Sequence, residues 1–219
     1  MNIGFNLKLR MAGAGLAVAL VAGGCATMAP KGERYVAPPL GSTWTQTYRN
    51  TGSFGSATPT VTTQVTERTW EGKRYLAFVG PTGTILANPV DGAWSTILAP
   101  DGSLAVSFDP PAGFEYPLVV GKTWSHSIRQ TLHKANKILQ NEVKNTVEAY
   151  EDVAVPAGTF KAFKIRQQWF LNSKLGNDHT IWFAPELGVF VKHLQRRTVD
   201  SSFGPGTQES EIVSQTITK

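Results

Sequence analysis

The chain has 219 residues, of which 41% are hydrophobic and 17% are charged, with 21 basic side chains against 16 acidic ones. Lys8 and Arg10 belong to a leader-like segment, and without them the balance is 19 against 16, a net charge of +3. Basic residues alternate with acidic ones along the rest of the chain, which argues against a nucleic-acid-binding protein. After the leader, no apolar stretch approaches the roughly 20 residues that a transmembrane helix needs.

Residues 1–24 have the layout of a secretory signal peptide. The first ten residues, MNIGFNLKLR, end in two cations, and a short apolar run of mostly small residues follows. The small residues Ala22, Gly23 and Gly24 lead directly into Cys25, the only cysteine of the chain. This arrangement resembles the lipobox of bacterial lipoproteins, with Ala22 where that family most often has Leu. A plain signal peptide followed by a free thiol is the alternative.

The resemblance to bacterial lipoproteins implies a membrane anchor. It implies that the leader is removed and that Cys25 carries fatty acyl chains such as palmitate. Because each buried methylene contributes about 0.8 kcal/mol, two or three acyl chains hold a protein firmly, whereas one binds reversibly. Ala26, and not Asp, follows the cysteine, and by the same resemblance we expect the periplasmic face of the outer membrane. Residues 25–41 are expected to form an extended spacer with Pro30, Pro38 and Pro39.

The segment 42–219 is predicted to be an all-β domain. Short runs of Thr, Val and aromatic residues are separated by Gly, Pro, Asn and Asp at intervals of roughly 8 to 12 residues. We expect a curved antiparallel sheet or an incomplete barrel. Its clearest strand places five alternate residues on one face: Phe163, Ile165, Gln167, Trp169 and Leu171.

A faint internal repeat divides this domain. The nine residues GSTWTQTYR at 41–49 recur as GKTWSHSIR at 121–129. Two similar β units, or two halves of one sheet that meet near 115–121, would explain the repeat. Chance recurrence of a common strand start is the alternative.

Residues 134–150 allow two interpretations. Leu139, Val143 and Val147 recur every four positions, which is compatible with a helix. The same residues, together with Ala149, also lie on one face of a strand, and a turn at Asn136 would return that strand antiparallel to the preceding one. We favour the strand.

The second half contains the sequence VPAGTF at 155–160, then WFAPELGV at 182–189 and Lys192. Over about residues 121–197 it resembles a group of uncharacterised exported bacterial β proteins. The resemblance implies a curved sheet or incomplete barrel, distantly like periplasmic lipoprotein carriers, but adds no chemistry. The fold alone accounts for the motif, because Pro156 shapes a turn, Phe160 enters the core and Gly188 closes a hairpin.

Sequence motifs of enzymes are missing. The GKT string at 121–123 has Tyr116 where a phosphate-binding loop needs glycine, and no G-x-S-x-G, H-E-x-x-H or paired cysteines occur. The acidic residues Glu148, Glu151 and Asp152 are interpreted as a solvated surface. We therefore predict a non-enzymatic protein with no cofactor.

Two histidines offer one testable geometry. If Phe183 pairs with Val189 across the PELG turn, His179 faces His193 on one side of the sheet. A divalent metal could bind there if Asp178 joined them, but we expect a surface pair and no metal site.

Six tryptophans are spread over nearly all of the expected strands: Trp44, Trp70, Trp94, Trp124, Trp169 and Trp182. They could line a concave surface for an apolar ligand, or they could fill the core, which we favour. The leading hypothesis is an envelope lipoprotein whose β domain binds a lipid or a partner protein. A structural or assembly subunit is the second hypothesis, and an envelope hydrolase with an unrecognised site is the third. A cavity or a filled core would separate carrier from scaffold.

Overall fold

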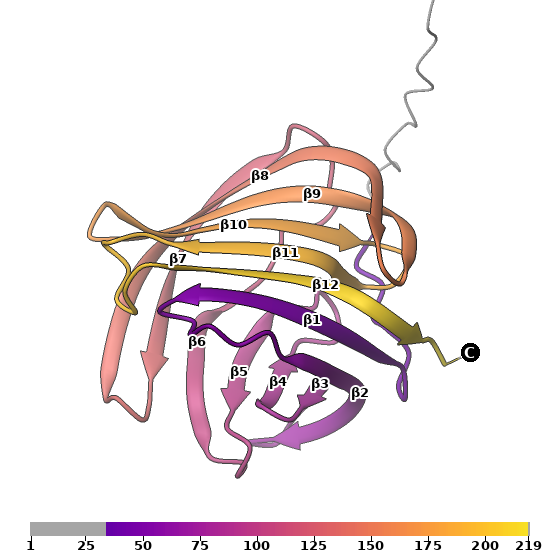
Figure 1. Cartoon of the computed structure of the whole chain (residues 1–219). Coiled ribbons are helices and arrows are strands. Elements are labelled where there is room, and N and C mark those ends of the chain that lie inside the picture. Colours follow the sequence, from indigo (N-terminus) through magenta and orange to yellow (C-terminus); the bar gives the residue numbers. More distant parts are fainter. Residues whose placement is uncertain (1–33, 219) are drawn as a thin grey trace, which may run out of the picture.

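The computed structural model describes residues 34–218. The predicted signal peptide, Cys25 and the first part of the spacer lie outside these residues. The described chain forms one closed antiparallel barrel, in which each strand pairs with the next and the last returns to the first (Figure 1). The strands are β1 (Thr43–Gly52), β2 (Thr60–Trp70), β3 (Lys73–Gly80), β4 (Gly83–Ala87), β5 (Trp94–Leu98), β6 (Leu104–Ala112), β7 (Thr123–Leu132), β8 (Lys137–Val155), β9 (Gly158–Leu171), β10 (Lys174–Ala184), β11 (Val189–Arg197) and β12 (Gly206–Thr216).

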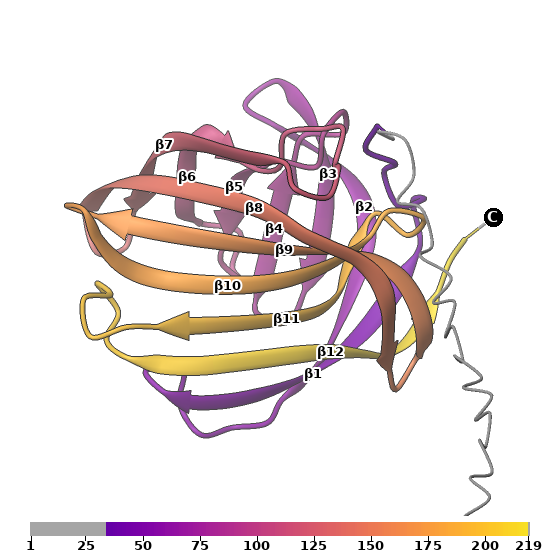
Figure 2. The same cartoon turned by 90° about the horizontal axis from the view of Figure 1, so that it is seen from above.

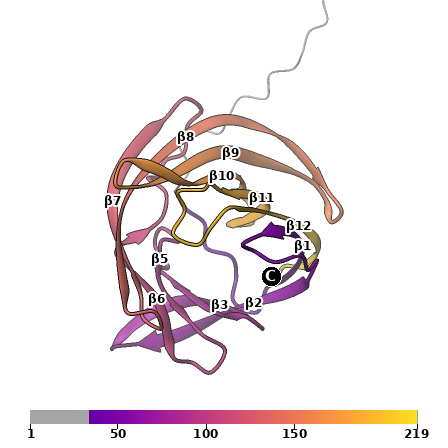
Figure 3. The same ribbon diagram turned by 60° about the vertical axis from the view of Figure 1, so that its left-hand side comes forward.

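The all-β fold class is confirmed, and the sheet closes completely. The seam pairs β1 with β12, from Thr43 opposite Thr216 to Gly52 opposite Gly206, with a bulge between Thr45 and Gln46. Figure 3, in which the left-hand side of Figure 1 comes forward, shows the strands arranged in a ring. Because the first strand pairs with the last, the described sheet has no edge strand. No helix in the described part is long and apolar enough to cross a membrane.

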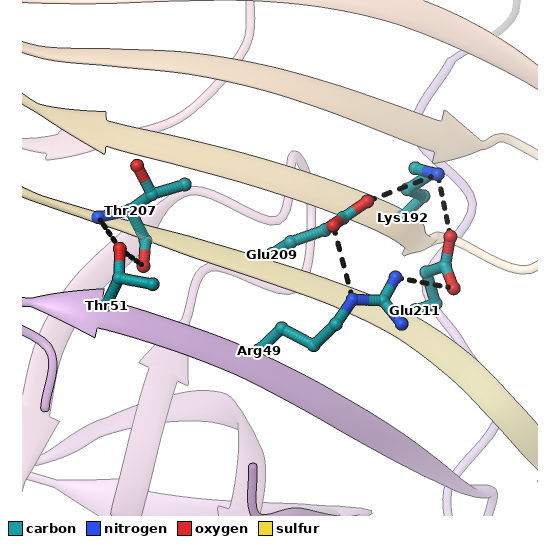
Figure 4. A network of polar contacts seen from close by, with 6 residues as sticks. All are labelled: Arg49, Thr51, Lys192, Thr207, Glu209 and Glu211. Carbon is teal, nitrogen blue, oxygen red and sulfur yellow. Dashed lines mark hydrogen bonds and ion pairs between the residues drawn. The ribbon is translucent and has the colours of Figure 1, made fainter. Parts of the chain in front are cut away.

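A network of ion pairs crosses the seam on the outer surface (Figure 4). Arg49 on β1 contacts Glu209 and Glu211 of β12, each at 3.3 Å. Lys192 on β11 lies 2.7 Å from Glu211 and 3.4 Å from Glu209. The hydrogen bond from Lys192 lowers the pKa of the Glu211 carboxyl below its ordinary value. Two cations and two carboxylates balance, so this cluster links three strands and leaves no net charge to attract a ligand.

The segment 134–150 is extended, so the strand interpretation is confirmed. Strand β8 starts after a turn in which Asn136 has φ 46°, and its residues alternate between buried and exposed from Leu139 to Val147. The expected place of Ala149 is wrong. A bulge after Val147 shifts the register, and Tyr150, not Ala149, pairs with Phe163 on the inner face, their ring centroids 4.7 Å apart.

The two copies of the internal repeat start β1 and β7, the first and seventh strands, with the same local geometry. Gly41 and Gly121 both have positive φ, 86° and 89°. Gly41 N donates to Val65 O, and Gly121 N donates to Val147 O, each at 2.8 Å. Both six-strand halves belong to one barrel, and their origin as two units stays a prediction.

The VPAGTF motif forms the tip of the β8–β9 hairpin, which extends past the barrel and curls back over it (Figure 2). Ala157 N donates to Ile212 O on β12 at 3.1 Å, and Phe160 is buried in a cluster with Val191 and Ile212. The expected core position of Phe160 is confirmed. Gly188, with φ 67°, closes the β10–β11 hairpin by donating to Ala184 O at 2.9 Å.

Candidate ligand-binding cavity

The barrel interior holds a cavity of about 570 Å³. It is lined by inward-facing side chains from most of the strands, including three of the six tryptophans, Trp44, Trp94 and Trp169. Trp124 instead packs in a buried core cluster. The expectation that tryptophans fill the core is therefore correct for only part of the set. On β9 the predicted common face is confirmed: Phe163 and Ile165 are buried, while Gln167 and Trp169 line the cavity.

The antiparallel topology gives the barrel two ends with different loops. The proximal end comprises residues 34–42, the loops at 88–93, 113–122 and 185–188, and the C-terminus. The distal end comprises the loops at 53–59, 133–136 and 198–205. In Figure 1 the C-terminus marks the proximal end on the right, and the β9–β10 and β11–β12 turns lie on the left.

Aromatic rings cover the proximal end. Tyr35, from the segment before β1, lies 5.7 Å from the ring of Tyr116 and 6.5 Å from that of Phe183, centroid to centroid. Phe114 packs against Phe183 at 6.0 Å. Burial raises the pKa of both tyrosine phenols above their ordinary value, so they stay neutral. Gly92 is required here, because a Cβ at this position would lie 2.6 Å from Cζ of Tyr35.

A single cation lines the distal part of the cavity. The guanidinium carbon of Arg197 lies 3.7 Å from the ring centroid of Phe54 and 4.8 Å from that of Phe203. Its Nη1 donates to Ser53 Oγ at 3.2 Å. Within residues 34–218, its Nε is buried without an acceptor and no carboxylate forms an ion pair with it. Burial lowers the pKa of Arg197, but an arginine stays protonated in proteins.

Between the two ends, the paired residues of β10 and β11 change from polar to aromatic in steps. Arg197 pairs with Asn177, Gln195 with His179, and His193 with Ile181. After a bulge between Trp182 and Phe183, Phe190 pairs with Phe183. All eight of these residues line the cavity. The part of the inner wall formed by β10 and β11 therefore has a polarity gradient from the distal to the proximal end.

The polar part of this wall continues into β9 and β8 through side-chain amides. Trp169 Nε1 donates to Gln167 Oε1 at 2.9 Å, and Gln167 Nε2 donates to Asn145 Oδ1 at 2.9 Å. Asn145 is buried on the inner face of β8. These two hydrogen bonds hold Gln167 between Trp169 and Asn145, whereas Nδ2 of Asn145 is buried without an acceptor among the described residues.

The histidine prediction is partly wrong. The expected register is not formed: Phe183 pairs with Phe190 and not with Val189, and the bulge shifts the pairing by one more residue, so His179 pairs with Gln195. The two histidines still share the inner face diagonally, their rings 5.2 Å apart and His179 Nδ1 3.0 Å from His193 Nε2. They line the cavity and do not form a surface pair. Asp178 points outward to Arg166, with Oδ2 2.8 Å from Nη2, so it cannot complete a metal site with them. In the part of the chain that the structure describes, no cluster of three metal-binding side chains occurs.

Burial keeps both imidazoles neutral. Desolvation lowers the pKa of His193 to about 4. Desolvation, followed by the nearby His193 and Arg197, lowers the pKa of His179 well below its ordinary value. Since both rings are uncharged at pH 7, one ring nitrogen donates and the other accepts in their shared hydrogen bond.

The acidic residues of the predicted surface cluster each contact a different side chain. Glu148 forms an ion pair with Lys164 at 3.0 Å, and Asp152 with Lys161 at 2.7 Å. Glu151 Oε1 accepts from Trp182 Nε1 at 2.8 Å. These contacts agree with the interpretation of this cluster as a surface.

No family model matches the sequence, and no curated protein is similar enough to count as a relative. Three solved structures are similar to this chain over most of its length. A candidate exported protein of Bacteroides fragilis with a YmcC-like fold has a TM-score of 0.46 and 14% identity, over 84% of this chain and 99% of that one. A candidate lipoprotein of Parabacteroides distasonis has a TM-score of 0.45 and 11% identity, over 84% and 99%. The hypothetical lipoprotein YmcC of Escherichia coli has a TM-score of 0.39 and 10% identity, over 82% and 87%. These three TM-scores lie below 0.5, and the similarity carries no conclusion about function.

Proposed function

We propose that this protein is a non-enzymatic envelope lipoprotein, tethered through Cys25, whose barrel binds a lipid or another apolar ligand. The observation that carries the ligand proposal is the cavity of about 570 Å³. This volume lies within the range of about 300–1,000 Å³ that is usual for small-molecule sites. Its aromatic lining and side-chain amides have the composition of such sites.

The strand number gives the physical reason for a cavity. A barrel of about eight strands is just wide enough for its own side chains to fill. With twelve strands the circumference grows, so inward side chains leave space inside the barrel, although Trp94 on β5 still reaches Phe190 on β11. This favours a carrier over a scaffold with a filled core.

The anchor proposal rests on the leader sequence that ends at Cys25. The first described residues lie at the proximal end, where Tyr35 packs against Tyr116, so this is the end that continues toward Cys25. The periplasmic face of the outer membrane is the location that we propose from Ala26.

The ligand proposal is tested by narrowing the cavity. Ile85 lines it from β4, whereas Val79 on the neighbouring β3 is 39% exposed and does not line it. We expect Ile85→Trp to weaken binding of the neutral fluorescent probe N-phenyl-1-naphthylamine at least about tenfold, and the control Val79→Trp to leave it unchanged. Thermal melting serves as the check that both variants fold. Equal binding by wild type and folded Ile85→Trp would contradict a site inside the barrel.

One observation favours the second candidate, an assembly subunit. Six exposed large hydrophobic residues belong to the proximal end: Val36, Leu40, Val90, Val119, Val120 and Ile217. Such residues, when they cover a surface together, mark contacts with a partner or a membrane. A photo-crosslinking residue at Val120 that captures no protein in intact cells, while lipid is captured, would argue against this candidate.

A further inference from the structure

We propose that the ligand is an anionic amphiphile, with its charged head group beside Arg197 and its aliphatic chain directed toward Tyr35 and Tyr116. This inference rests on the proposed function and adds the chemical class and the orientation of the ligand. The shared chemistry is a carboxylate or phosphate group on an aliphatic chain.

The first argument is charge. Of the described residues that line the cavity, those charged at pH 7 are Arg197 and Asp91. Arg197 has no carboxylate partner within residues 34–218, although it is partly withdrawn from water between two phenyl rings. A desolvated cation without a counter-charge is costly, and an anionic group beside it offsets that cost. Planar guanidinium is also the side chain best suited to carboxylates and phosphates.

The second argument is the position of the one acidic side chain. Asp91 belongs to the proximal loop at 88–93, and its Oδ1 accepts from Ala93 N at 2.9 Å. Negative charge at the proximal end and positive charge at the distal end orient an anionic head group toward Arg197.

The third argument is the polarity gradient of the wall. The residue pairs run from Arg197 and Asn177 through the histidines to Phe190 and Phe183. From Arg197 to Phe190 the strand covers about 23 Å at a rise of roughly 3.3 Å per residue. A polar head followed by an apolar chain matches this order, whereas the reverse orientation would bury a charge against the aromatic rings.

Matched probes test the head group in the mature full-length domain. Calorimetry at pH 8 compares dodecanoate, dodecanol and dodecyltrimethylammonium, with Arg197→Gln and the control Arg196→Gln, whose side chain is exposed on the same strand. We expect wild type to bind dodecanoate about tenfold or more tightly than dodecanol, and the cation weakest. Arg197→Gln should remove the preference for dodecanoate and keep dodecanol binding, and Arg196→Gln should change neither.

Three outcomes separate the proposals. Equal affinity of wild type for dodecanoate and dodecanol would overturn the head-group inference and leave the lipid-binding function intact. An unchanged preference in Arg197→Gln would overturn the role of Arg197. If wild type binds none of the three probes, the proposed function itself fails, and this inference fails with it.

A second measurement tests the orientation in protein that keeps Arg197, so it does not depend on the folding of that variant. Trp94 begins β5 at the proximal end and packs on Phe190 with centroids 6.1 Å apart, whereas Trp169 pairs with Asn177 at the distal end. We expect 12-bromododecanoate, with bromine at the chain end, to quench tryptophan fluorescence less in Trp94→Phe than in Trp169→Phe. Greater loss of quenching in Trp169→Phe would place the chain end distally and overturn the orientation.

Discussion

The two ends of the cavity differ in the side chains that surround them, although both belong to one continuous sheet. At the proximal end, the neutral rings of Tyr35, Tyr116 and Phe114 pack together. At the distal end, Arg197 is enclosed by Phe54 and Phe203 from two loops. Strands β10 and β11 span both ends, with aromatic side chains facing the cavity at one end and polar side chains at the other. Packing stabilises the proximal end, whereas the distal end retains a charge that costs stability, as binding sites commonly do.

The largest effect is expected on membrane association, which we propose involves the segment that continues from the proximal end. Cys25→Ser removes the thiol that we propose carries the acyl chains. The protein should move completely from the membrane fraction to the soluble fraction, or accumulate as the uncleaved precursor, while circular dichroism of the barrel stays unchanged. A Cys25→Ser protein that is processed normally and remains on the membrane would refute the anchor.

A second prediction compares the stability of the two ends. Phe183 is 2% exposed at the proximal end, and Phe183→Ala should reduce the free energy of unfolding by about 3–5 kcal/mol in urea titrations. Arg197→Met removes a partly buried cation that has no carboxylate partner in the described residues, and should leave the free energy of unfolding of the ligand-free protein unchanged or raise it. A large loss of stability in ligand-free Arg197→Met would show that the distal cation is structural.

A third prediction concerns the middle of the wall. The folded pKa of His193 is about 4, below the ordinary value near 6.5, so the unfolded chain binds the proton more tightly. The contribution to stability is complete above about pH 6.5 and is lost as pH falls toward 4. The free energy of unfolding should decrease by up to about 3 kcal/mol across this interval.

The control for this pH effect is His193→Gln, which should flatten the dependence between pH 6.5 and 4. Nδ1 of His179 lies 3.0 Å from Nε2 of His193, and the pKa of His179 is also lowered. A smaller dependence of the free energy of unfolding on pH should therefore remain in His193→Gln. An unchanged slope in His193→Gln would assign the acid sensitivity to other groups.

The smallest effect is expected outside the barrel. The Arg49 side chain is more than half exposed in the seam network. Arg49→Ala should therefore lower the free energy of unfolding by no more than about 1 kcal/mol in urea titrations. Ligand affinity should not change, since Arg49 lies outside the cavity. A change in dodecanoate binding would mean that the outer charges, and not only the two cavity ends, control the ligand.

Local patterns in the sequence predicted individual strands well, and the inward face of β9 is an example. Closure was not predictable, because β1 and β12 pair residues as distant as Thr43 and Thr216, and no local pattern records such a contact. The errors of register arose from a bulge in β8 and, in the β10–β11 hairpin, from the turn and a bulge together, since each extra residue exchanges the inner and outer faces of a strand. For the same reason, the sequence QRRT could not show that Arg197, and not Arg196, faces the cavity.

Tyr35 gives the tether a second role. It is ten residues after Cys25, a length of chain that reaches at most about 36 Å. If Cys25 is fixed in the bilayer, the segment that joins it to the barrel includes Tyr35, whose ring lies at the proximal end of the cavity. In chain order Tyr35 comes before β1, so a force applied at such an anchor would reach this ring before it reached the barrel.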